Sequence, residues 1–132
     1  MSQENVEIVR QALDAYARRD IEAMRRLNSA DVVLDWSASH GWLAGVYRGW
    51  DEVMRFYADY FDIFESIRIE AEAYMPAGDS VVVPNIAYQR GRDGIEVTAR
   101  GTFVFRLREG KLRTIRLYQD LPEALKAVGL EE

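Results

Sequence analysis

Apolar residues recur at steps of three and four positions near the start of the chain. They form one stripe over residues 6–16, which predicts an amphipathic helix that begins near Ser2. Arg18 and Arg19 fall in its last turn, where positive charge interacts favourably with the helix dipole. Asp20 then provides a cap for a second, short helix, because aspartate is a preferred residue at that position.

The pattern next changes to alternation. After a turn at residues 28–31, Val32, Leu34 and Trp36 lie on one face of a predicted strand. Residues 37–47 contain glycines and serines, and we interpret them as a loop over the mouth of a pocket.

A third helix is predicted over residues 51–64, with a broad apolar and aromatic face, and almost everything after it alternates. Residues 95–107 present one long period-two face, and residues 92–94 are a strong hairpin signal. Pro84 lies inside another of these strands and favours an edge position or a bulge. Helices followed by a β meander predict an α+β fold in which a curved sheet wraps the helices.

Composition is that of one folded domain, residues 1–132, with 48% hydrophobic and 11% aromatic residues. The net charge is −5 and the basic residues are scattered among acidic ones, which argues against nucleic acid and anionic membrane surfaces as partners. The N-terminus has no signal-peptide pattern, and no apolar run reaches the ~18 residues that span a bilayer. Together with the lack of cysteine, this predicts a cytoplasmic protein.

Cofactors and metals are not expected from these residue types. The chain has no cysteine and a single histidine, His40, which cannot build a zinc site alone. The glycines do not form a phosphate-binding loop ahead of a helix. Two interpretations of His40 remain, namely an exposed loop residue and an acid/base group at the pocket mouth beside Trp42.

Several short motifs resemble, in order, the SnoaL-like, polyketide cyclase-like branch of the nuclear transport factor 2-like superfamily. They are residues 4–10, 30–36, 45–49, 78–83, 105–111 and 118–120. The resemblance implies a cone-shaped α+β barrel, with three N-terminal helices packed on a strongly curved mixed or antiparallel sheet, and a homodimer. It does not imply one activity, since relatives include cyclases, isomerases, epoxide hydrolases and non-catalytic binding domains.

Ketosteroid isomerase chemistry is not expected. The resemblance to ketosteroid isomerases puts Trp36 at the position of the base, Ala12 at that of the tyrosine and Phe103 at that of the acid. None of these side chains can supply the required group. Asp35 is adjacent, but strand alternation turns it to the opposite face.

Asp120 is the candidate acid. The resemblance to polyketide cyclases puts a general acid/base at the end of the last strand, where this chain has Asp120, with Tyr88, Tyr118 or His40 assisting. Burial among aromatic rings would raise the pKa of such a carboxyl and favour proton exchange near neutrality. The alternative is that Asp120 caps the short C-terminal helix that opens at Pro122.

Aromatic residues from several elements are expected to converge on a ligand pocket or to pack as core. The pocket candidates are Tyr16, Trp36, Trp42, Tyr57, Tyr88, Phe103 and Tyr118. Two hypotheses follow. The first is a cofactor-independent cyclase, isomerase or lyase that binds a small apolar or aromatic molecule and uses Asp120. The second is a non-catalytic ligand-binding or dimer-scaffold domain.

Overall fold

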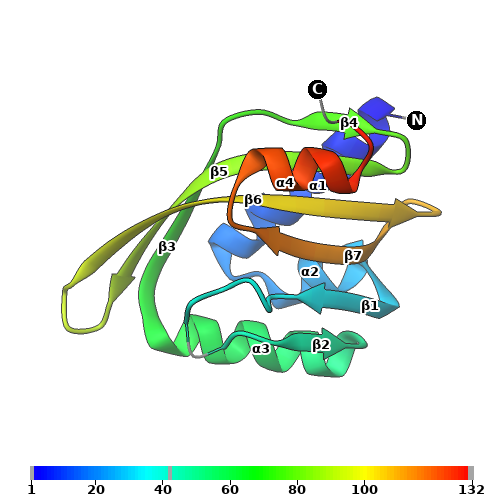
Figure 1. The fold of residues 1–132 in the computed structure, drawn as a ribbon. Helices are drawn as coiled ribbons and strands as arrows, with labels where there is room; N and C mark the ends of the chain where they lie inside the picture. Colours follow the sequence, from blue (N-terminus) through cyan, green and yellow to red (C-terminus); the bar gives the residue numbers. More distant parts are fainter. Residues whose placement is uncertain (1, 42, 131–132) are drawn as a thin grey trace.

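The computed structural model describes residues 2–41 and 43–130, in which helices pack inside and outside a strongly bent sheet (Figure 1). The helices are α1 (Ser2–Arg18), α2 (Ile21–Leu27), α3 (Trp50–Ile63) and α4 (Leu121–Ala127). The strands are β1 (Asn28–Asp35), β2 (Val46–Arg48), β3 (Phe64–Ala71), β4 (Met75–Ala77), β5 (Ser80–Gly91), β6 (Glu96–Arg108) and β7 (Lys111–Tyr118). None of the helices in this part of the chain is long and apolar enough to cross a membrane.

The sheet is mixed and does not close on itself. Its strand order is β2-β1-β7-β6-β5-β3, with β4 also beside β5. The pair β1–β7 is parallel, whereas β5 and β6 form a long antiparallel hairpin that projects beyond α3 (Figure 1). Register shifts in three of the pairings, β1–β7, β3–β5 and β6–β7, mark irregularities of the kind that bend a strand.

The α+β class and the curved mixed sheet are therefore confirmed. The description of three N-terminal helices was slightly off, because α3 follows β1 and β2 in the chain and α4 adds a fourth helix. The predicted turn at residues 28–31 was also wrong, since β1 already begins at Asn28. Asn28 pairs with Leu112 of β7, and this long-range pairing extends the strand.

Two apolar clusters lie on opposite faces of β5 and β6. On the concave face, Val81, Val83 and Phe105 pack against α1, α2 and α3. On the convex face, Val82 and Tyr118, with Val104, pack against Ala124 of α4. Successive side chains of a strand point to opposite faces, so the alternation seen in the sequence separates the two clusters.

Pro84 is not at an edge of the sheet, contrary to one of the two sequence-based alternatives. It pairs with Thr102 of β6 on one side. On its other side, β5 pairs with β4 up to Val82 and with β3 from Asn85 onward. Pro84 therefore lies at the point where the pairing of β5 changes from β4 to β3. Because no regular pairing is made on that side at this position, the missing N–H of proline removes no hydrogen bond from the sheet.

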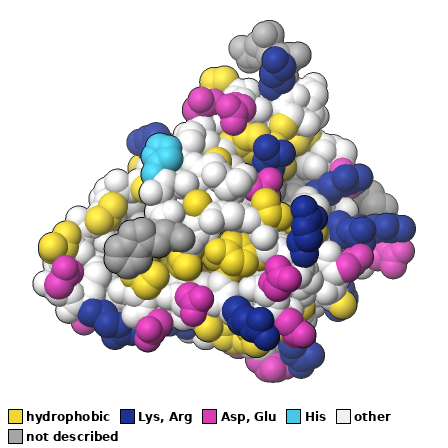
Figure 2. Space-filling view, turned by 60° about the horizontal axis from the view of Figure 1, so that its bottom comes forward, with side chains coloured by type: hydrophobic (Ala, Val, Ile, Leu, Met, Phe, Trp, Pro, Cys, Tyr) yellow, Lys and Arg dark blue, Asp and Glu magenta, His cyan; other side chains and the backbone are white. Residues whose placement is uncertain are grey.

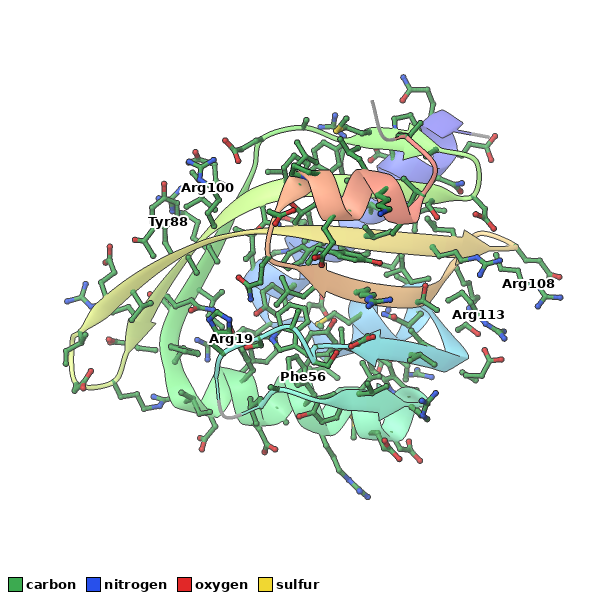
Figure 3. All side chains as sticks on the ribbon, in the orientation of Figure 1. Arg19, Phe56, Tyr88, Arg100, Arg108 and Arg113 are labelled. Atoms are coloured by element: carbon green, nitrogen blue, oxygen red, sulfur yellow. The ribbon has the colours of Figure 1, made fainter. Side chains whose placement is uncertain are left out.

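Arg19 joins the end of α1 to the end of α3. Its guanidinium donates hydrogen bonds to the carbonyl oxygens of Phe61, Phe64 and Glu65 at 2.9, 2.7 and 2.7 Å. It also lies 5.3 Å from the centre of the Phe61 ring (Figure 3). Phe61 is in the last turn of α3, Phe64 is its C-cap, and Glu65 follows in β3. Helix α3 has no basic residue in its own last turn, so Arg19 supplies positive charge and hydrogen-bond donors at this terminus.

Charged side chains of both signs cover the surface. Figure 2 shows Lys and Arg interspersed with Asp and Glu over the face that includes α3. Surface ion pairs include Arg113 with Asp31 at 2.6 Å and Arg106 with Asp79 at 3.2 Å. This is the mixed-charge surface that the sequence predicts.

Arg19→Ala is expected to lower the free energy of unfolding by about 2 kcal/mol, because backbone carbonyls at the end of α3 lose their charged donor. Urea denaturation followed by circular dichroism measures this. Arg18→Ala is the matched control, because the adjacent Arg18 makes exposed ion pairs with Asp14 and Asp20 and should contribute little. Equal losses in the two variants would contradict the assigned role of Arg19.

Candidate functional site

A wide pocket of about 460 Å³ opens on the concave face of the sheet. Alternate residues of β5 and β6 form its floor, and α3, Tyr16 and the segment after β1 form its walls. The floor residues are Asn85, Ala87, Gln89, Val97, Ala99, Gly101 and Phe103. Because these positions alternate along their strands, the twist and pleat of the hairpin present them to one side.

The polar side chains of this wide pocket include three carboxamides, Asn85, Gln89 and Gln119, together with Ser39, His40, Tyr60 and Arg100. Gln89 donates through Nε2 to the Tyr60 hydroxyl and thereby links β5 to α3. Asn85 is 1% exposed, and its Nδ2 donates to the Val83 carbonyl oxygen at 3.0 Å. No Asp or Glu occurs among the described residues that line the pocket. A pocket of this composition can bind a largely apolar molecule and orient it by hydrogen bonds.

A second, smaller cavity of about 40 Å³ lies deeper in the fold, which we call the inner cavity. Tyr16, Trp36 and Phe103 line both this cavity and the wide pocket. The rings of Trp36 and Phe103 are 5.6 Å apart, and Trp36 contacts Phe56 edge-on at 5.5 Å. These aromatic side chains therefore form the boundary between the two spaces.

Two tyrosines face the inner cavity. The rings of Tyr16 and Tyr57 meet edge to face at 5.6 Å, and both residues line the space. Burial raises the pKa of Tyr57 well above its ordinary value near 10. Burial, followed by the neighbouring Tyr60 and Tyr57 hydroxyls, raises the pKa of Tyr16 as well. Both hydroxyls therefore stay neutral in mildly alkaline solution and can donate hydrogen bonds.

Asn28 is a lining residue of the inner cavity that sequence reasoning missed. It is 6% exposed, and its Nδ2 donates to the Met24 carbonyl oxygen at 2.7 Å. Its Oδ1 is buried and has no hydrogen-bond partner among the described residues. An asparagine near the end of a helix is usually a cap or turn residue, so the sequence carried no signal for this acceptor.

Some predicted pocket residues do come together. Tyr16, Trp36, His40 and Phe103 line the wide pocket, and Tyr57 lines the inner cavity. His40 is an exposed residue at the rim, so it is both a loop residue and a pocket residue. Trp42 lies outside the described residues.

Asp120 does not line either cavity. It is exposed, and its Oδ1 accepts a hydrogen bond from the Glu123 backbone N–H at 2.9 Å, which makes it the N-cap of α4. The capping alternative is thus confirmed, and the geometry removes the support for Asp120 as a pocket acid. Helix α4 packs on the convex face of the sheet, so its cap is directed away from the concave side.

Tyr88 and Tyr118 are also placed elsewhere than predicted. Tyr88 alternates with the floor residues Ala87 and Gln89, and the Arg68 guanidinium lies 4.0 Å from its ring centre (Figure 3). Tyr118 is buried on the convex face beside α4, whereas the preceding residue, Leu117, lines the pocket. Strand parity accounts for both corrections.

The positions that correspond to isomerase groups meet at the inner cavity. Ala12, Trp36 and Phe103 all line it, and none carries a carboxyl or hydroxyl group.

The comparisons with known proteins agree with this fold. The profile of the SnoaL-like domain matches residues 9–115. An NTF2-like protein of unknown function from Burkholderia pseudomallei K96243 is 24% identical, with a TM-score of 0.80 over 97% of this chain and 98% of that chain. A search of curated protein sequences finds no match.

Two further similar structures were crystallised with small molecules. TerC, crystallised with polyporic acid, is 20% identical, with a TM-score of 0.78 over 95% of this chain and 97% of that chain. A Mycobacterium tuberculosis protein in complex with estradiol-17β-hemisuccinate is 18% identical, with a TM-score of 0.79 over 89% of this chain and 95% of that chain. At these identities the likeness shows a common fold.

Tyr57→Phe is expected to reduce the loss of stability at alkaline pH. The folded-state pKa of Tyr57 is raised, so above about pH 10 the unfolded chain releases a proton that the folded protein keeps. Stability therefore falls as pH rises, by up to about 1.4 kcal/mol per pH unit for one such tyrosine. Denaturant titrations from pH 8 to 11, each referred to the same variant at pH 7, measure the slope. An unchanged slope in the variant would count against a buried, neutral hydroxyl.

Proposed function

Because the chain belongs to the SnoaL-like domain family, we propose that it binds a small, largely apolar or aromatic molecule in the wide pocket. The observation that carries this proposal is the pocket itself, about 460 Å³ in volume and walled by aromatic and aliphatic side chains. Pockets for small molecules typically have volumes of roughly 300–1,000 Å³ and few polar groups. The space therefore fits a molecule of a few fused or linked rings.

The polar residues suggest how such a molecule is oriented. Asn85 and Gln89 lie on the same face of β5, and a third carboxamide, Gln119, lines the pocket beyond β7. Carboxamides donate and accept hydrogen bonds without carrying charge, so they suit carbonyl and hydroxyl groups on a neutral ligand. The similar structures that hold polyporic acid and estradiol-17β-hemisuccinate lend support, because the same fold accommodates organic ligands in them.

Acid–base catalysis on the bound molecule is the second candidate function, and His40 is the residue that favours it. His40 lines the rim of the wide pocket, where Asp and Glu are missing from the described lining. Imidazole is a common general acid and base, and His40 is positioned to exchange a proton with a ligand in the pocket. A cyclase-, isomerase- or lyase-type step would therefore depend on His40 in place of Asp120.

A homodimer and a cytoplasmic location remain predictions. The first rests on the family resemblance, and the second on composition. The alternative to an enzyme is a non-catalytic dimer scaffold, which needs no acid or base residue in the pocket.

Ala99→Phe is expected to weaken ligand binding at least about tenfold, because a ring at this floor position occupies the pocket. Ala99 is exposed, so the larger side chain should fold without overpacking the core. Equilibrium dialysis against aromatic polyketides, steroids and terpenoids measures the affinities.

Thr98→Phe is the matched control for that experiment. Thr98 is the neighbouring residue on β6 and is not part of the pocket lining, so the same change there should leave the affinities unchanged. If no compound of the panel binds the wild-type protein saturably, or if both variants bind as the wild type does, the proposed pocket is wrong.

His40→Gln is expected to abolish turnover of any bound compound that the wild type converts, while its Kd changes less than about threefold. Glutamine keeps hydrogen-bonding capacity but cannot exchange a proton near neutrality. Product formation by mass spectrometry, with dialysis in parallel, separates the two effects. Retained turnover in this variant would remove His40 from the proposed chemistry.

A further inference from the structure

We infer that the inner cavity is a subsite for a single neutral hydrogen-bond donor, a hydroxyl or N–H group, at one end of the ligand. This inference rests on the proposed function, because the body of the ligand is assigned to the wide pocket. It narrows the ligand class to apolar or aromatic molecules with a terminal alcohol, phenol or comparable donor.

The unpartnered oxygen of Asn28 is the first observation. Buried polar atoms in proteins are almost always hydrogen-bonded, because water that has been removed must be replaced by another partner. Asn28 Oδ1 is buried and lacks one among the described residues. Rotating the carboxamide to exchange its two ends would break the hydrogen bond from Nδ2 to the Met24 carbonyl oxygen at 2.7 Å, so the atom without a partner is the oxygen. The unmet acceptor therefore belongs to the side of Asn28 away from α2, and Asn28 is a lining residue of the inner cavity.

The size of the inner cavity is the second observation. About 40 Å³ exceeds the ~10–15 Å³ that one water molecule needs, but it cannot hold a ring system. The space suits one small group of a larger molecule, or an ordered water in its absence. Apart from Asn28, Tyr16 and Tyr57, the indole N–H of Trp36 is the one other hydrogen-bond donor among the described lining side chains, so water there has few other partners.

Hydroxyl groups complete the polar lining. Tyr16 and Tyr57 both border the inner cavity, and neither hydroxyl has a hydrogen bond to the described part of the protein. Both stay neutral because burial raises their pKa. A ligand hydroxyl can therefore donate a hydrogen bond to Asn28 Oδ1 and accept one from a tyrosine hydroxyl, so that it acts as both donor and acceptor.

The shared walls connect this subsite to the wide pocket. Tyr16, Trp36 and Phe103 border both spaces, so a ligand whose rings lie against them can direct its end into the inner cavity. An ionised carboxylate is disfavoured there, because it would be desolvated and would face the lone pairs of Asn28 Oδ1. The subsite accordingly selects a neutral donor.

The test compares 2-naphthol with 2-methylnaphthalene, which have the same rings and a hydroxyl or a methyl group of similar size. At pH 7, equilibrium dialysis is expected to show that wild type binds 2-naphthol about tenfold or more tightly, despite the greater hydrophobicity of the methyl compound. In Asn28→Leu this preference should fall to less than about twofold, mainly through loss of affinity for 2-naphthol.

Met24→Leu is the matched control. Met24 lines the same cavity, and this exchange between apolar side chains keeps Asn28 Oδ1, so the preference for 2-naphthol should persist. Because Asn28→Leu also removes the bond to Met24, a crystal structure of the wild type with 2-naphthol provides a measurement that does not depend on the variant. The naphthol oxygen is expected within hydrogen-bond distance of Asn28 Oδ1.

The outcomes separate the two proposals. If both compounds bind saturably with equal affinity, or if the naphthol oxygen lies against Asn85 or Gln89, the subsite is overturned and the wide pocket stands. If neither compound binds, while other members of the dialysis panel do, the subsite is overturned for aromatic donors. If nothing in the panel binds, the proposed function fails and the inference fails with it.

Discussion

Alternation along the long β5–β6 hairpin is the constraint on which the rest of this structure depends. Away from its turn, the hairpin is buried on two faces, with α1, α2 and α3 against one and α4 against the other. The concave face consequently carries both the main core and the floor of the wide pocket, and the convex face carries a small separate cluster. A shift of register by one residue would exchange these faces and remove the pocket floor.

The depth of the pocket depends on how α3 is held against that hairpin. Arg19 ties the last carbonyls of α3 to the end of α1, and Arg92, in the turn after β5, donates to the Asp62 carbonyl oxygen at 2.6 Å. Gln89 adds a bond to Tyr60 on the same helix. Aromatic side chains of α3 meet Tyr16 and Trp36, and Trp36 in turn meets Phe103, so the boundary between pocket and inner cavity is built from ring contacts.

Much of the candidate site followed from residue spacing. Phe103 and Trp36 were assigned to inward faces from period-two patterns, and both line the wide pocket. The same alternation along β5 and β7 places Tyr88 and Tyr118 on the outward face. They were nevertheless predicted in the pocket, because aromatic residues were expected to converge there. Asp120 was open to two interpretations, because an aspartate before a proline-initiated helix and an aspartate at a strand end have the same local sequence.

The sequence by itself determined the α+β class, the positions of most turns and which residues share a face, because these depend on local periodicity. Tertiary structure alone decided which buried polar atoms are left without partners, since burial brings together elements that are far apart in the chain. Asn28 illustrates the difference: locally it ends α2, but it also pairs with Leu112 of β7 and lines the inner cavity, and its Oδ1 is buried without a partner among the described residues. The need of this oxygen for a hydrogen-bond donor therefore arises from tertiary packing and could not be predicted from the local sequence.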